Sequence, residues 1–159
     1  MVSSLSKSSS RADSTIGHIL AVDYGRRRIG LAVSDELGLT AQPLATLVRS
    51  NRRNDLRRLR EIVRKHGVRR IVVGHPVHLD GSAGEMAGEA ARFAARIERE
   101  TGLPVELVDE RLTSWEAEHV QAETKAGRRR GRRGVDQIAA AVILREYLER
   151  EQVRKVARG

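Results

Sequence analysis

Four carboxylates follow segments that could bring them together in a folded chain. Asp23 ends an apolar run at 19–22, Asp109 and Glu110 end another at 105–108, and Asp136 follows an Arg- and Gly-rich stretch. Carboxylates from separate elements repel one another unless a divalent cation joins them. Oxygen ligands without His or Cys at fixed spacing favour Mg²⁺ or Mn²⁺ over zinc. Because such ions activate water and stabilise the leaving oxygen of a phosphodiester, the pattern predicts metal-dependent phosphodiester chemistry.

Each acid also has a structural interpretation when it is taken alone. Asp23 precedes a turn-forming glycine, and Asp109 and Glu110 could be exposed strand ends. Asp136 could favour the positive end of a helix dipole. Asp109 and Glu110 are adjacent, and their positions alone do not distinguish which of them would be the second acid.

Hydrophobic periodicity predicts the elements that must position these acids. Short apolar runs predict strands at 18–24, 29–33, 44–48, 70–73 and 104–108. Helical spacing predicts helices at 52–66, between 84 and 102, from 113, and at 135–153, with Ile138, Ala141, Val142 and Leu148 of the last helix inward. Three antiparallel strands followed by parallel additions predict an α/β protein with a mixed five-stranded sheet and helices on both faces. This order resembles the ribonuclease-H-like (RNase-H-like) fold.

Composition limits the classes of protein that the chain can belong to. Its 159 residues fit one domain, expected at 17–150, with a disordered Ser-rich tail at 1–16 and a basic C-terminal tail at 151–159. The absence of Cys excludes a disulfide scaffold, a zinc knuckle and a thiol nucleophile. No apolar run is long enough to span a membrane, and residues 1–14 lack the apolar region of a signal peptide. We therefore expect a cytoplasmic protein without membrane partners.

Positive charge is concentrated in two islands. The formal net charge is +9; residues 49–70 hold ten cations and two acids, and residues 125–133 hold six cations and no acid. This distribution indicates nucleic-acid binding, although solvated helix faces in an Arg-rich chain are the alternative. With only four aromatic residues, phosphate contacts must dominate. The arginines expected to contact nucleic acid are Arg26, Arg27, Arg28, Arg128, Arg129, Arg130, Arg132 and Arg133.

Four stretches of the sequence resemble the signatures of one known family. They are AVDYGRRRIGLAVSD at 21–35, VVGHP at 72–76 with DGS at 80–82, DERLT at 109–113, and VDQIAA at 135–140. These stretches, in this order, are similar to the YqgF family of pre-16S rRNA nucleases and RuvX-type Holliday-junction resolvases. The resemblance implies an RNase-H-like fold, a Mg²⁺ or Mn²⁺ cofactor, and Asp23, Glu110 and Asp136 as catalytic and metal-binding acids.

Two residues within these stretches receive structural interpretations. His75 stands where the family pattern commonly has Leu, and a polar loop role is favoured over a proton relay. Asp35 matches the family pattern at the end of a strand, where a turn role is favoured.

The preferred function is an endonuclease that processes the 5′ end of pre-16S rRNA, acting on structured RNA as a monomer or homodimer. Cleavage of branched DNA at a Holliday junction is the runner-up, for which a symmetric dimer would suit a two-fold substrate. A non-catalytic nucleic-acid-binding module is a third hypothesis. A phosphotransferase is a fourth, because residues 23–25 and Gly30 also look like the first phosphate loop of actin-like ATPases.

Overall fold

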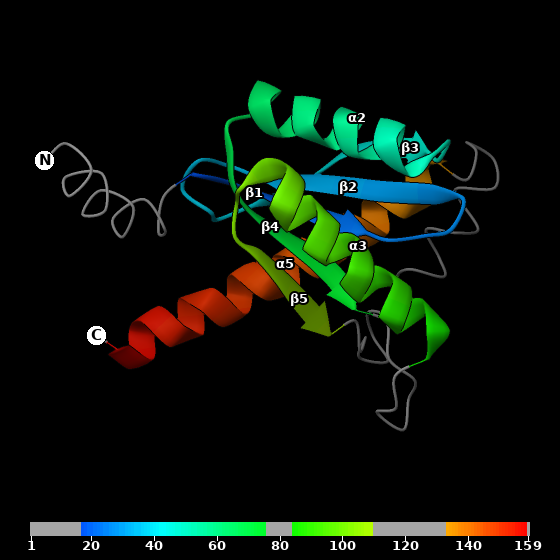
Figure 1. Ribbon diagram of the computed structural model, residues 1–159. Coiled ribbons are helices and arrows are strands. Elements are labelled where there is room, and N and C mark those ends of the chain that lie inside the picture. The colour runs from blue at the N-terminus through cyan, green and yellow to red at the C-terminus, as the bar shows by residue number, and fades with distance from the viewer. Residues whose placement is uncertain (1–16, 76–83, 110–132, 159) are drawn as a thin grey trace, which may run out of the picture.

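The computed structural model describes residues 17–75, 84–109 and 133–158 (Figure 1). In chain order the elements are β1 His18–Asp23, β2 Arg28–Ser34, β3 Ala41–Val48, α2 Arg52–Lys65, β4 Val68–His75, α3 Glu85–Thr101, β5 Val105–Asp109 and α5 Arg133–Arg158. Among the described residues, none of the helices has the length and apolarity that crossing a membrane requires. The tail expected at 1–16 and the helix expected from residue 113 lie outside the described residues.

The sheet has the mixed topology that the sequence predicts. Its strand order is β3-β2-β1-β4-β5. The pairs β1–β2 and β2–β3 are antiparallel, whereas β1–β4 and β4–β5 are parallel. β1 is central, and its residues Leu20, Ala21 and Val22 are fully buried. The predicted α/β class is therefore confirmed.

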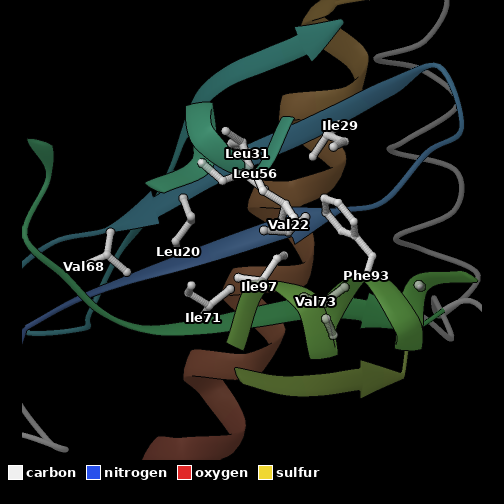
Figure 2. Close-up of a cluster of buried hydrophobic side chains, with 13 residues drawn as sticks. Leu20, Val22, Ile29, Leu31, Leu56, Val68, Ile71, Val73, Phe93 and Ile97 are labelled. Atoms are coloured by element: carbon white, nitrogen blue, oxygen red, sulfur yellow. The ribbon is translucent and has the colours of Figure 1, made fainter. Parts of the chain in front are cut away.

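Helices cover both faces of this sheet. Leu20 and Val22 of β1 point to one face, where Figure 2 shows them in a cluster with Phe93 and Ile97 of α3. The same cluster includes Leu56 and Leu59 of α2. Ala21 points to the other face and packs in a second cluster with Ala140, Ile143, Leu144 and Tyr147 of α5. Because side chains alternate along a strand, neighbouring residues of β1 point to opposite faces of the sheet.

The last helix differs from its prediction in length and in phase. α5 runs from Arg133 to Arg158, so residues 151–158, expected as a basic tail, are helical. Of the four residues predicted to point inward, Leu148 is buried and Ala141 is half-buried against the same cluster, whereas Ile138 and Val142 are only half-buried. The physical reason is the unbroken apolar run at 138–144, in which no polar residue marks the phase of the helix.

Candidate active site

Asp23 lies at the end of the central strand. In the antiparallel β1–β2 pair it is opposite Gly30. Residues two apart on a strand point to the same face of the sheet. Ala21 packs against α5, so Asp23 also lies on the α5 face. The residue is partly buried and interacts with other groups of the protein. The strand thus presents this carboxylate on the face from which Asp136 approaches.

Gly30 lets the start of α5 approach the sheet closely. A Cβ atom built on Gly30 would lie 2.0 Å from the carbonyl oxygen of Asp136 and 2.4 Å from its carbonyl carbon. No side chain fits at that separation, so only glycine allows the Asp136 backbone to lie this close to β2. Since Gly30 is the cross-strand partner of Asp23, the same contact brings Asp136 next to the end of β1. Two of the three predicted acids are therefore brought to one region of the structure.

The Asp136 carboxylate is held by an arginine of β2. Arg28 donates from Nε to Oδ2 of Asp136 at 2.7 Å, and the two side chains are 29% and 23% exposed. A pair this sheltered is screened less than a surface ion pair. The carboxylate predicted to bind a metal thus has an internal cationic partner.

The other two arginines of this segment differ from each other. Arg26 is bound to α3: its Nη2 lies 2.7 Å from Oε2 of Glu89, and its Nε donates to both carboxylate oxygens. The hydrogen bond from Arg26 is the main cause that lowers the pKa of Glu89 below its usual range. Arg27 is exposed, and its side chain forms no ion pair within the described ranges. Of the three arginines at 26–28, only Arg27 is thus free of an ion pair within the described ranges.

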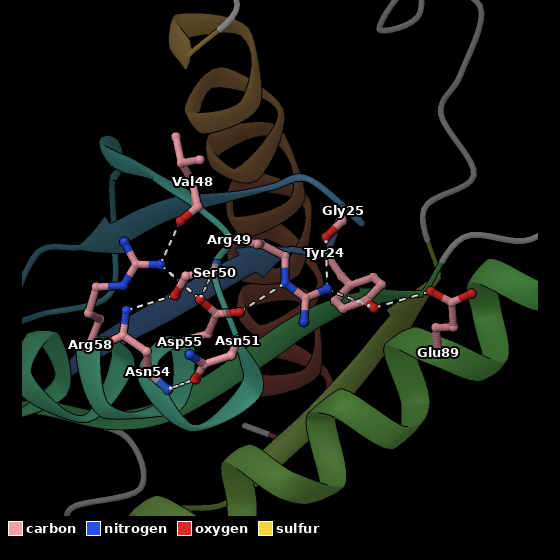
Figure 3. A network of polar contacts seen from close by, with 10 residues as sticks. All are labelled: Tyr24, Gly25, Val48, Arg49, Ser50, Asn51, Asn54, Asp55, Arg58 and Glu89. Atoms are coloured by element: carbon pink, nitrogen blue, oxygen red, sulfur yellow. Dashed lines mark hydrogen bonds and ion pairs between the residues drawn. The ribbon is translucent and has the colours of Figure 1, made fainter.

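A polar network ties the segment after Asp23 to the opposite face of the sheet (Figure 3). Arg49 donates from Nη1 to the Tyr24 hydroxyl at 2.9 Å and to the Gly25 carbonyl at 3.2 Å. The Tyr24 hydroxyl in turn donates to Oε1 of Glu89. The Arg49 guanidinium also lies over the Tyr24 ring, 5.0 Å from its centroid. These contacts fix the backbone that directly follows Asp23.

Asp55 neutralises this network from inside α2. Its side chain is only 1% exposed, and it accepts from Arg49 Nε at 3.1 Å, Arg58 Nη2 at 2.8 Å and the Ser50 amide at 3.1 Å. Burial by itself raises the pKa of Asp55, but these hydrogen bonds more than offset it, so the pKa lies below its usual value. A charged carboxylate is therefore part of the folded core.

Replacing Asp55 by Asn should destabilise the protein by about 3 kcal/mol at neutral pH, because it leaves two half-buried arginines without a counter-ion. The depressed pKa means that the stabilisation is present above the unfolded-state value of about 3.9 and is lost as the pH falls through the folded-state value. Urea unfolding at pH 7 and at successively lower pH measures this difference. A loss below about 1 kcal/mol at pH 7 would contradict the structural role.

Asp35 has the turn role that the sequence analysis favours. Its Oδ1 accepts from the backbone amides of Leu39 at 2.6 Å and Thr40 at 2.9 Å. The hydrogen bond from Thr40 is the main cause that lowers the pKa of Asp35. Asp35 follows the C-terminal end of β2, which is antiparallel to β1, so it lies at the other end of the sheet from Asp23.

The remaining predicted site residues are not described. Glu110, Arg128, Arg129, Arg130 and Arg132 lie outside the described residues, and Arg133 begins α5 with its side chain undescribed. Asp109 pairs with His75 in the β4–β5 register, two strands from β1 and hence about 10 Å away across the sheet. In the part of the chain that the structure describes, no three His, Cys, Asp or Glu side chains are grouped to hold a metal ion.

Comparison with solved structures identifies the class of fold. Thermus thermophilus RuvC bound to a Holliday-junction substrate aligns with a TM-score of 0.54 at 16% identity, covering 86% of this chain and 96% of that one. A second structure of RuvC from the same organism aligns with a TM-score of 0.50 at 14% identity, covering 85% of this chain and 96% of that one. The protein has the RNase-H-like fold of these resolvases.

Sequence comparison identifies the family. Residues 17–150 match the family described as "RuvX: Holliday junction resolvase". The protein named "Putative pre-16S rRNA nuclease" from Koribacter versatilis is 47% identical over 137 residues, 86% of this chain and 90% of that protein. Its namesake from Syntrophus aciditrophicus is 44% identical over 138 residues, 87% of this chain and 92% of that protein. The chain belongs to the RuvX (YqgF) family, a family of nucleases with the RNase-H-like fold.

Proposed function

We propose that this protein is a divalent-metal-dependent endonuclease of structured RNA that processes the 5′ end of pre-16S rRNA. The observation that carries the proposal is the contact of Asp136 with Gly30, the cross-strand partner of Asp23. It joins two acids, distant in sequence, at the end of the central strand of an RNase-H-like sheet. Relatives that are 47% and 44% identical over most of the chain are named as pre-16S rRNA nucleases. These names favour RNA as the substrate.

The donor groups of the site fit Mg²⁺ or Mn²⁺. Asp23 and Asp136 offer carboxylate oxygens, the ligands these ions prefer. Glu106 accepts from the Tyr147 hydroxyl of α5 and Val108 packs in the α5 cluster, so even-numbered positions of β5 face α5. Glu110 lies outside the described residues, and the resemblance to the family signature at 109–113 is what favours it over Asp109 as the third ligand. The bound ion would polarise the phosphate and lower the pKa of an attacking water.

The protein's own side chains would hold the substrate and orient the acids. Arg28 positions the Asp136 carboxylate, and Arg26, bound to Glu89, anchors the segment after Asp23. Arg27, which is exposed, would contact a phosphate beside the scissile bond. The basic residues between 125 and 133, which precede Asp136 in the chain, would contact the strand on the other side.

Cleavage of branched DNA is the second candidate, because the matching family is described as a Holliday-junction resolvase. Incubating the protein with a pre-16S rRNA precursor and with a four-way DNA junction in parallel separates the two functions. Each substrate is tested with Mg²⁺, with Mn²⁺ and with EDTA. We expect metal-dependent cleavage of the precursor RNA at its 5′ side and little cleavage of the junction. Cutting of the junction alone would favour the second candidate, and binding without cleavage under any metal would overturn both.

Replacing Arg28 by Gln should tighten Mn²⁺ binding about threefold to fivefold, because the guanidinium competes with the ion for Asp136. Arg27→Gln is the matched control, since it removes the same charge one residue away, where no ion pair is present within the described ranges. Isothermal titration of both variants and of wild type with Mn²⁺ measures the difference. Unchanged or weaker binding in Arg28→Gln alone would show that Arg28 does not compete for the carboxylate.

A further inference from the structure

Helix α2 turns a strongly basic side to solvent. It carries seven cations and two acids, whereas α3, which covers the same face of the sheet, carries three cations and four acids. One acid of α2, Asp55, is buried against arginines, and the other, Glu61, pairs with Arg57 at 3.3 Å. The exposed cations of α2 are Arg52, Arg53, Arg57, Arg64 and Lys65.

The stability of the helix accounts for only some of these charges: Arg64 and Lys65 lie in the last turn, where the dipole favours cations, whereas the other exposed cations do not. Arg52 and Arg53 lie in the first turn, where the helix dipole disfavours cations. Arg53 and Arg57 are like charges at i,i+4, a spacing that is destabilising. Arg60 and Arg64 have the same spacing, although Arg60 also pairs with Glu100 of α3 at 2.7 Å. Within the described ranges, Arg52, Arg53, Arg64 and Lys65 form no ion pair. A polyanion bound along α2 would remove this repulsion.

The basic helix starts at the same end of the sheet as the candidate active site. Val48, the last residue of β3, pairs with Arg28, and the Arg49 amide donates to the Arg27 carbonyl at 2.8 Å. α2 begins three residues later at Arg52 and ends just before β4 starts, at the opposite end of the sheet (Figure 1). Its 14 residues span about 21 Å. The cations therefore form a line that leads away from the site.

We propose that the outer face of α2, from Arg52 to Lys65, is a docking track for the phosphate backbone of the substrate RNA beyond the cleaved position. None of the exposed large hydrophobic side chains of the described residues lies on α2. Protein interfaces need buried apolar or aromatic anchors, whereas phosphate contacts need only cations and polar donors. The track increases the affinity for the RNA and orients it at the site. The inference rests on the proposed function only in identifying the bound polyanion as RNA.

The test compares two triple variants that lose the same charge. The α2 variant is Arg52→Gln, Arg53→Gln and Arg64→Gln; the control is Arg150→Gln, Arg154→Gln and Lys155→Gln, three exposed cations near the end of α5. Binding of a pre-16S rRNA fragment and of a four-way DNA junction is measured by fluorescence anisotropy at several salt concentrations. EDTA is present throughout, so the result does not depend on cleavage. Circular dichroism confirms that both variants are folded.

We expect the α2 variant to bind the RNA at least about tenfold more weakly at 0.1 M salt, with a salt slope lower by about two. The control should change affinity by less than about twofold. Equal losses in the two variants would show that only net charge matters, and no loss would show that α2 does not contact RNA; either result overturns the track. A loss confined to the DNA junction would overturn RNA as its ligand.

Discussion

Replacing Asp23 by Asn is expected to reduce RNA cleavage on the order of a thousandfold while leaving RNA binding intact. The carboxylate would supply a charge that holds the metal ion, and the neutral amide would not. Asn has nearly the same shape, so the end of β1 should keep its place opposite Gly30. Single-turnover cleavage in Mg²⁺ and anisotropy binding in EDTA measure the two properties separately.

Asp35→Asn is the matched control for this substitution. It removes a carboxylate from the same family-like stretch, 21–35, but at the other end of the sheet, where Asp35 accepts from the Leu39 and Thr40 amides. We expect it to lower stability by about 1 kcal/mol and to leave cleavage unchanged. Full activity in Asp23→Asn, or an equal loss in Asp35→Asn, would remove Asp23 from the site.

Replacing Gly30 by Ala should cause the second large effect, without changing any charge. The new methyl group would lie 2.0 Å from the Asp136 carbonyl oxygen, so the start of α5 must move away from β2. We expect a stability loss of about 1–3 kcal/mol and a drop in cleavage of about a hundredfold, because the two acids no longer meet in the productive geometry. Thermal unfolding and single-turnover cleavage measure these effects.

Gly134→Ala provides a control two residues before Asp136. A Cβ at Gly134 would meet no atom of another described residue within 4 Å beyond its chain neighbours and its own helix, and alanine favours a helix more than glycine does. This variant should be as stable as wild type or slightly more so, with full activity. If Gly30→Ala cleaved RNA as fast as Gly134→Ala does, the close approach of α5 to the strand would have no role in assembling the site.

The strands and the mixed directions of the sheet could be predicted from the sequence because local patterns indicate them. Short apolar runs mark β1, β2 and β4, and the short connection between β1 and β2 permits only an antiparallel hairpin. α2 is predicted because its leucines and arginines separate onto two sides. Where the pattern was uniform, as at 138–144 in α5, length and phase could not be predicted.

The polar network around Tyr24 could not be predicted, because its members are distant in sequence. Arg49 meets Tyr24 from 25 residues away, and Glu89 meets it from 65 residues away. One signal was available: Asp55 shares a helical side with Leu59 and Ile62, an apolar side on which a lone acid requires a partner. The sequence could not identify Arg49 and Arg58 as that partner.

The site itself stays a prediction, and only the proximity of Asp23 and Asp136 can be compared with the structure. Asp23 and Asp136 were identified as acids that should converge, but the means of convergence, the glycine at position 30, depends on a backbone contact across more than a hundred residues. The Arg28–Asp136 pair was also missed, because Arg28 in a run of three arginines gives no indication of an individual partner. Asp35 was interpreted correctly because its turn is local.

The location of a bound divalent ion tests the central claim most directly. A crystal of the protein soaked in Mn²⁺ and measured at the manganese edge would reveal the ion by its anomalous signal. We expect a peak between Asp23 and Asp136, about 2.0–2.3 Å from an oxygen of each carboxylate, with Arg28 withdrawn from Asp136. A crystal of active enzyme with manganese bound elsewhere, and none between these two carboxylates, would contradict the account.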